Sequence, residues 1–138
     1  MADNTRLSKY GILLAAVVVA GAIVIWQSHT GSQPPTTIRV TVPSLSTDAQ
    51  EGQVIFEANC AGCHGEDAAG SDQGPPLVHK IYEPSHHGDQ SFLAAVRNGV
   101  RRHHWQYGNM PPQPGVSNRQ VTQIVTYVRE LQRANGIN

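Results

Sequence analysis

Charge is scarce in this sequence, and neither sign prevails. Only ten of the 138 residues are Lys or Arg and ten are Asp or Glu, so the formal net charge is zero with neutral histidine. No block of like charges occurs, and basic residues are not interleaved with aromatic ones, so nothing in the composition indicates nucleic-acid binding. The length allows one modest domain with appendages and is too short for two ordinary domains.

Bulky apolar side chains are also few outside one N-terminal run. Phenylalanine occurs only at Phe56 and Phe92. A domain of about 90 residues with so little bulky apolar volume cannot build a generous core from side chains alone. We therefore expect something other than side chains to fill the centre, with small helices packed around it.

The one long apolar run is GILLAAVVVAGAIVIW, at residues 11–26. It contains no charged residue, and Tyr10 and Trp26 flank it as amphipathic rings do at the two membrane interfaces. These features predict an N-terminal transmembrane helix that remains attached as an anchor. The alternative is a signal peptide, which has a similar basic start and apolar run but ends at a cleavage site of the A-x-A type. No such site follows Trp26.

The charges around this run predict its orientation. Arg6 and Lys9 precede it, whereas the residues directly after it are uncharged. The positive-inside rule then keeps residues 1–10 in the cytoplasm and places the rest of the chain outside, in an oxidising compartment. Residues 27–46 are rich in Ser, Thr, Pro and Gln and are interpreted as a linker. Residues 47–138 are interpreted as the globular domain.

Three helices are predicted in this domain, which makes it all-α. The first begins with a capping box in which Thr47 is the N-cap, and it ends near Asn59. The second covers residues 89–100, where apolar residues recur at helical spacing. The third follows a capping box at Ser117 and carries a regular apolar stripe that fades before Gly136. The connections between the helices are rich in Gly, Pro and His.

Both cysteines lie in the stretch NCAGCHGE, residues 59–66, with His64 directly after Cys63. A thioredoxin-like dithiol needs a βαβ context, which the helical surroundings do not provide. A structural zinc site needs four ligands, and no second C-x-x-C or H-x-x-x-H pair is present. A disulfide between Cys60 and Cys63 would close a very small loop and gain little. C-x-x-C-H is instead the signature of covalent haem attachment, in which both cysteines form thioethers and His64 binds the iron.

Together with its surroundings, this motif resembles the membrane-anchored monohaem class I c-type cytochromes, over about Thr47 to Ile137. Gly52 and Phe56 look like the small and aromatic residues of that family's N-terminal helix, and Tyr127 matches the aromatic position of the C-terminal helix that it crosses. The resemblance implies a small class I cytochrome c fold, with about three to five short helices wrapped around one covalent haem c.

The same resemblance implies how the iron would be held. The stretch GPPL at residues 74–77 is similar to the family's G-P-x-L turn, so the Pro75 carbonyl would accept a hydrogen bond from His64 and orient it. The stretch NMPP at residues 109–112 is similar to the family's distal loop, with Met110 as the sixth ligand. Met110 is the only methionine besides Met1. Histidine and methionine together as ligands are associated with electron transfer.

Several polar residues before Met110 are candidates for further roles. Arg101 and Trp105, with Arg102 and Tyr107 beside them, are expected to donate hydrogen bonds to haem propionates. Two pairs of adjacent histidines flank the second predicted helix: His86 with His87, and His103 with His104. Such pairs could bind an additional metal, or one histidine could replace Met110 on the iron. More often they are solvated, or they bond to propionates and loop backbone.

The expected function is one-electron transfer by a His/Met-ligated haem c that is tethered to the periplasmic face of a bacterial cytoplasmic membrane. The resemblance implies a quinol–cytochrome c oxidoreductase or a periplasmic dehydrogenase as donor and a haem–copper terminal oxidase as acceptor. The protein would not itself be an enzyme. The alternatives are a fixed haem subunit of a larger oxidase or dehydrogenase complex, or, less favoured, a haem peroxidase or sensor.

Overall fold

The computed structural model describes residues 17–22 and 37–138, which belong to two units, Met1–Gln33 and Pro34–Asn138. Residues 17–22 are helical. Most of the predicted membrane anchor at residues 11–26 lies outside the described residues. Within the described parts of the chain, no helix combines the length and the hydropathy that crossing a membrane requires.

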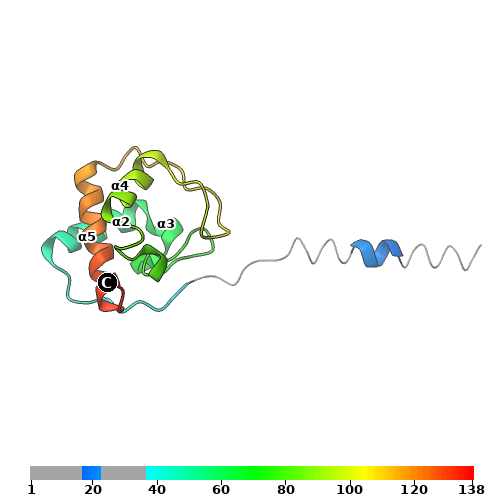
Figure 1. The fold of residues 1–138 in the computed structure, drawn as a ribbon, viewed down its shortest axis with the longest axis horizontal. Helices are drawn as coiled ribbons and strands as arrows, with labels where there is room; N and C mark the ends of the chain where they lie inside the picture. Colours follow the sequence, from blue (N-terminus) through cyan, green and yellow to red (C-terminus); the bar gives the residue numbers. More distant parts are fainter. Residues whose placement is uncertain (1–16, 23–36) are drawn as a thin grey trace, which may run out of the picture. The chain divides into compact units, whose positions relative to one another are not determined.

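The second unit is built from helices and loops (Figure 1). Its α-helices are α2 (Thr47–Asn59), α3 (Ala61–His64), α4 (Asp89–Asn98) and α5 (Asn118–Ala134). Two 3₁₀ turns, η1 (Glu66–Ala68) and η2 (Lys80–Tyr82), lie between α3 and α4. In residues 37–138 the only β-type pairing is an isolated antiparallel bridge between Val100 and Met110. The helical character of the domain is thus as the sequence predicts.

The domain is organised around the crossing of α2 and α5 (Figure 1). Gly52 of α2 lies directly against the backbone of Gln123 and Ile124 in α5. Close by, the rings of Phe56 and Tyr127 pack at a centroid distance of 5.6 Å, and both side chains are fully buried. The crossing that the family resemblance implies is therefore present, and these aromatic rings form its centre.

Helix boundaries agree with the sequence prediction except at two ends. Ser46, not Thr47, caps α2, because the Ser46 hydroxyl accepts a hydrogen bond from the Ala49 N–H. At α4 the helix ends at Asn98 rather than Val100, since Gly99 has φ +73° and carries the chain into the bridge with Met110. The capping box at Ser117 is present at the start of α5.

Residues 37–46, the second half of the predicted linker, lie on the surface of the domain. Ile38, Val40 and Leu45 pack against its hydrophobic core. Thr41 exchanges two hydrogen bonds with the Asn135 side chain, each of 2.9 Å. Residues before 47 are therefore part of the packed domain, because three apolar side chains of this segment are partly buried against its core. The rest of the linker lies outside the described residues.

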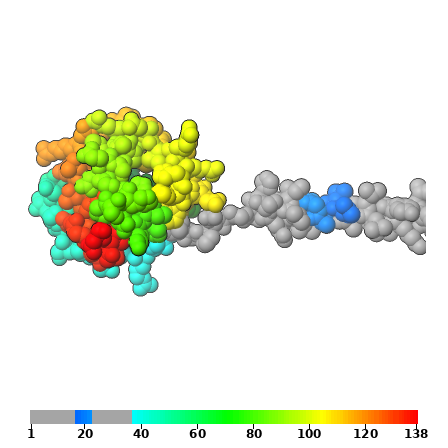
Figure 2. All heavy atoms as spheres, viewed as in Figure 1, coloured from blue at the N-terminus to red at the C-terminus, as the bar shows by residue number. Residues whose placement is uncertain are grey.

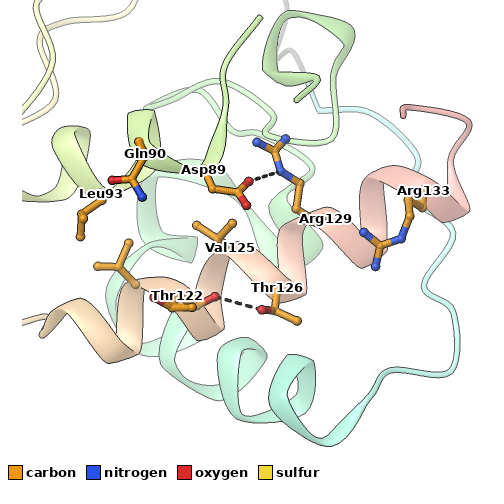
Figure 3. Close-up of a pocket in the computed structure, with 9 residues that line it drawn as sticks. Asp89, Gln90, Leu93, Thr122, Val125, Thr126, Arg129 and Arg133 are labelled. Carbon is orange, nitrogen blue, oxygen red and sulfur yellow. Dashed lines mark hydrogen bonds and ion pairs between the residues drawn. The ribbon is translucent and has the colours of Figure 1, made fainter. Parts of the chain in front are cut away.

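Arg129 connects α5 to α4, and its side chain is only 8% exposed. Its guanidinium donates to the Asp89 carboxylate at 2.9 Å and to the carbonyl oxygens of Tyr82 and His87 at 2.6 Å each. Figure 3 shows Arg129 reaching from α5 to Asp89 at the start of α4. One side chain thus fixes the beginning of α4 and the turn of residues 82–87 that precedes it.

Candidate functional site

Cys60, Cys63 and His64 lie on one tight helical turn. Cys60 is at once the C-cap of α2 and the N-cap of α3, and the His64 N–H donates to the Cys60 carbonyl at 2.9 Å. Both cysteines are free thiols, with Cys60 partly buried and Cys63 exposed. Burial, and then the neighbouring Cys63, raise the pKa of Cys60 to about 11, so its thiol is protonated at neutral pH. The turn holds two free thiols beside one imidazole.

The orientation of His64 is fixed by a residue far along the loop. His64 Nδ1 lies 2.9 Å from the Pro75 carbonyl oxygen. A carbonyl can only accept, so Nδ1 carries the proton and Nε2 keeps a free lone pair. Burial lowers the pKa of His64, and the hydrogen bond to Pro75 opposes this only in part, which favours the neutral imidazole. The hydrogen bond that the resemblance implies is present, and it leaves Nε2 as the atom able to bind a metal.

The loop that brings Pro75 to His64 depends on two glycines. Gly65 has φ +73°, and a Cβ there would collide with the backbone of Gly70. A Cβ on Gly74 would lie 2.9 Å from the Cys63 carbonyl oxygen. The same carbonyl accepts a 2.6 Å hydrogen bond from the Ser71 hydroxyl. The turn can therefore approach α3 only because position 74 has no side chain.

The position of Met110 is fixed by hydrogen bonds of its backbone. Its N–H and C=O each bond to Val100, at 3.0 and 2.9 Å, and the side chain is partly buried against the core. Residues 100–110 form one long loop between these two bonded positions (Figure 2, yellow). The bridge gives Met110 a defined backbone position at the end of that loop.

Trp105 and Arg101, both expected near the propionates, differ in their surroundings. Arg101 is exposed. Trp105 is partly buried, with its ring 5.0 Å from that of His79, and its Nε1 is buried without a hydrogen-bond partner among the described residues. A buried indole N–H without an acceptor is costly and rare. The Trp105 indole N–H thus makes no hydrogen bond of ordinary geometry among the described residues, although the Tyr82 hydroxyl lies near enough for Trp105 to lower its pKa, whereas Arg101 is exposed.

Some contacts that shape the site carry no signal in the sequence. The Tyr107 hydroxyl donates to the Ser71 carbonyl oxygen at 3.1 Å, which ties the 100–110 loop to the turn after α3. The Tyr127 hydroxyl donates to the Asp67 carboxylate at 3.0 Å, and Asp67 itself has φ +53°. Ser71 and Asp67 occur in a polar loop, and only the folded structure reveals what they contact.

These residues match the chemical requirements of a covalently attached haem. Two free thiols, a neutral imidazole with Nε2 available and an unpaired buried N–H donor are the groups that haem vinyls, iron and a propionate would use.

A surface hollow of ≈ 370 Å³ between α4 and α5 contains none of the predicted site residues. Leu93, Val125 and Arg129 are among the residues that line it (Figure 3).

A profile of the cytochrome c family matches residues 49–132, which is more than half of the chain. The chain therefore belongs to the cytochrome c family, the class that its helical domain and C-x-x-C-H turn also indicate, and membership implies haem c as the cofactor. The resemblance to c-type cytochromes that the sequence motifs indicate is thus confirmed.

Two curated relatives are similar over the same part of the chain. The Cbb3-type cytochrome c oxidase subunit CcoP of Rhodobacter capsulatus is 34% identical over 95 residues, which are 64% of this chain and 31% of that protein. A second CcoP sequence, from a particular strain of the same species, is 30% identical over 95 residues, with the same coverage. The chain thus spans about a third of the length of these relatives. No solved structure matches it significantly.

Proposed function

We propose that this protein is a one-electron carrier with a single covalent haem c. Cys60 and Cys63 would hold the haem through thioethers to its vinyl groups, and His64 Nε2 and the Met110 sulfur would bind its iron. When bound, the haem supplies a site that accepts and releases one electron. The observation that carries the proposal is the 2.9 Å hydrogen bond from His64 Nδ1 to Pro75, which commits one ring nitrogen to the protein and leaves the other for iron.

The surrounding residues keep this centre rigid. The Pro75 carbonyl fixes the plane of the His64 ring and increases the basicity of Nε2. The bridge between Val100 and Met110 fixes the backbone that carries the second ligand. A centre whose ligands stay in place reorganises little during electron transfer, and His/Met ligation is associated with a raised potential. These features favour a carrier over a peroxidase or a gas sensor, since both of the latter need an open ligand position.

The N-terminal run supports the proposed location, and the relatives support a terminal oxidase among the proposed partners. The run at residues 11–26 supports a membrane anchor, with the haem domain in the periplasm. A tethered carrier would remain concentrated near membrane-bound donors and acceptors. We propose a quinol–cytochrome c oxidoreductase or a periplasmic dehydrogenase as donor, and a terminal oxidase as acceptor.

A second candidate function is a fixed haem subunit of a larger complex. The similarity to CcoP favours it, because that protein is a subunit of a Cbb3-type cytochrome c oxidase. Mild detergent extraction followed by native electrophoresis distinguishes the two. A constant ratio of this chain to oxidase subunits in one band supports the fixed subunit, and a free haem-staining band supports the shuttle.

The ligand set is tested on the purified full chain by absorption spectroscopy. Wild type should be low-spin and show the weak near-infrared band that methionine ligation gives ferric haem. Met110→Leu, which conserves volume but removes the sulfur, should lose that band. In Cys60→Ser/Cys63→Ser, haem should no longer migrate with the chain on a denaturing gel. A high-spin wild-type spectrum would contradict the carrier function.

A further inference from the structure

Four histidines from two separate loops gather on the surface of the domain. His86 and His87 lie in the turn between η2 and α4, and His103 and His104 lie in the loop after α4. Ring centroids are 4.5 Å apart for His86 and His87, 5.0 Å for His86 and His104, and 5.2 Å for His87 and His104. The two loops therefore meet through imidazoles from both sides.

The rings are oriented so that one nitrogen of each is already used. His86 Nδ1 and His87 Nδ1 both lie within hydrogen-bond distance of the Ile81 carbonyl oxygen, at 2.9 and 2.6 Å. Because a carbonyl accepts only, both Nδ1 atoms carry protons, so Nε2 is the nitrogen that bears the lone pair in the neutral form of each ring. Histidines that bind metals in proteins usually donate their other N–H to a backbone carbonyl or carboxylate in this way. The pattern is thus that of preoriented ligands.

Ring nitrogens of three of these histidines lie close together. His86, His87 and His104 each offer a ring nitrogen, and these three atoms all lie within 4.8 Å of one another. Imidazole nitrogens on one tetrahedral zinc ion, with Zn–N bonds of about 2.0 Å, would lie roughly 3.3 Å apart. A small rotation of exposed or half-exposed rings would close this gap. His103 is outside the group of three, although its ring centroid is 4.3 Å from that of His104.

The supports of the two loops are independent of any metal. Arg129 bonds to the carbonyl oxygens of Tyr82 and His87 and so holds the first turn at both ends. In the second loop the Arg102 N–H donates to the side-chain oxygen of Asn109 at 3.0 Å.

We propose that His86, His87 and His104 form a binding site for one late first-row divalent metal ion such as Zn²⁺, separate from the haem ligands. Imidazole is a preferred ligand for zinc, copper and nickel, and three protein ligands leave a position for water. The bound ion would join the turn before α4 to the loop that ends at Met110. It would therefore restrain the loop of residues 100–110.

The test uses the haem-loaded full chain, purified without a polyhistidine tag and stripped with a chelator. The chain is dialysed against zinc chloride and desalted, zinc per haem is measured by mass spectrometry, and affinity is measured by calorimetry. We expect one zinc per chain. His86→Gln, His87→Gln and His104→Gln should each weaken binding at least about tenfold, since even residues that only support metal ligands are worth roughly 10–100-fold.

His103→Gln is the matched control, because it removes a neighbouring imidazole that is not in the group of three. It should stay within about twofold of wild type, the scale of an ordinary surface substitution. Haem content and circular dichroism of every variant establish that the domain has folded. Absence of zinc from the desalted wild type would overturn the proposal. Binding that survives His104→Gln, or that His103→Gln abolishes equally, would also overturn it.

Discussion

Gly52 in α2 lies against the carbonyl group of Gln123 in α5, so close that a Cβ at position 52 would overlap the carbonyl oxygen. The atoms opposite Gly52 are backbone, which cannot rotate away as the end of a side chain can. The distance between α2 and α5 is therefore set by the absence of a side chain at one position. The Phe56 and Tyr127 rings pack at 5.6 Å beside this contact, so their packing depends on the same approach.

Gly52→Ala should destabilise the domain by about 3 kcal/mol, because overpacking against a rigid neighbour costs more than alanine gains as a helix former. Urea unfolding of the haem-loaded protein, followed by far-ultraviolet circular dichroism, measures the change. Gly115→Ala is the control, since a Cβ at position 115 would meet nothing within 4 Å. Equal midpoints for the two variants would mean that α2 and α5 can separate at no cost.

Arg129→Lys should lower the free energy of unfolding by about 2 kcal/mol. The guanidinium bonds to the Asp89 carboxylate and to the Tyr82 and His87 carbonyl oxygens from one buried position. A lysine ammonium cannot reproduce that planar fork, so at least one buried acceptor loses its partner. The measurement is again chemical unfolding.

Arg133→Lys provides the comparison for this variant, because Arg133 lies one turn further along α5 and is exposed. Its effect should stay within about 0.5 kcal/mol. Arg129→Lys should also weaken zinc binding if the turn of residues 82–87 carries metal ligands. A stable Arg129→Lys protein with unchanged unfolding would show that the turn is held by other contacts.

The alkaline stability of the protein should depend on Tyr82. Burial raises the pKa of Tyr82 from 10.0 to about 12, with Trp105 acting in the opposite direction and Tyr107 adding to the rise. Between these pH values the unfolded chain releases the phenolic proton and the folded chain keeps it, so the free energy of unfolding falls as pH rises. The fall should amount to about 2 kcal/mol and is complete above the folded-state pKa.

Tyr82→Phe removes the phenolic proton. The free energy of unfolding of this variant should therefore fall less steeply than that of wild type between pH 10 and 12. Below this range the two proteins should show parallel pH dependence. The burial-raised pKa of Tyr127 contributes equally to both proteins and cancels in the comparison. Identical alkaline slopes for wild type and Tyr82→Phe would contradict the assignment.

Local patterns in the sequence predicted the helices well, because the residues that start and stabilise each helix lie within it or next to it. The Ser117 capping box and the apolar stripe of α5 are contained within the helix itself. The N-cap of α2 was wrong by one residue, since Ser46 and Thr47 are both good caps. The hydrogen bond from the Ser46 hydroxyl to the Glu130 carboxylate, at 2.7 Å, joins Ser46 to α5 and could not be read from local pattern.

Contacts between loops that lie far apart in the chain could not be predicted from the sequence, because their causes lie outside any local pattern. The spacing C-x-x-C-H and the GPPL stretch indicated the His64–Pro75 pair through resemblance, and the hydrogen bond is present. Nothing in the sequence pattern indicated that the rings of His86 and His104, which lie on either side of α4, would have centroids 5.0 Å apart. That proximity depends on how Arg129 holds the turn before α4 and how Tyr107 holds the loop after it.

Trp105 and Arg101 were both expected to donate hydrogen bonds to the haem propionates. Their surroundings differ, so we expect their effects on the redox potential to differ. The Trp105 Nε1 is buried and has no partner among the described residues, whereas Arg101 is exposed. A buried N–H that donates to a propionate offsets its negative charge without screening by water. Without this donor, the uncompensated charge favours the oxidised iron.

Trp105→Phe should therefore lower the midpoint potential by on the order of 30 mV, where about 59 mV corresponds to a tenfold change for one electron. Arg101→Gln should lower it less, because solvent and salt screen an exposed guanidinium. Redox titration of the full chain measures both shifts, and an unchanged low-spin spectrum shows that the axial ligands are retained. A larger shift for Arg101→Gln than for Trp105→Phe would transfer the propionate role from the indole to the guanidinium.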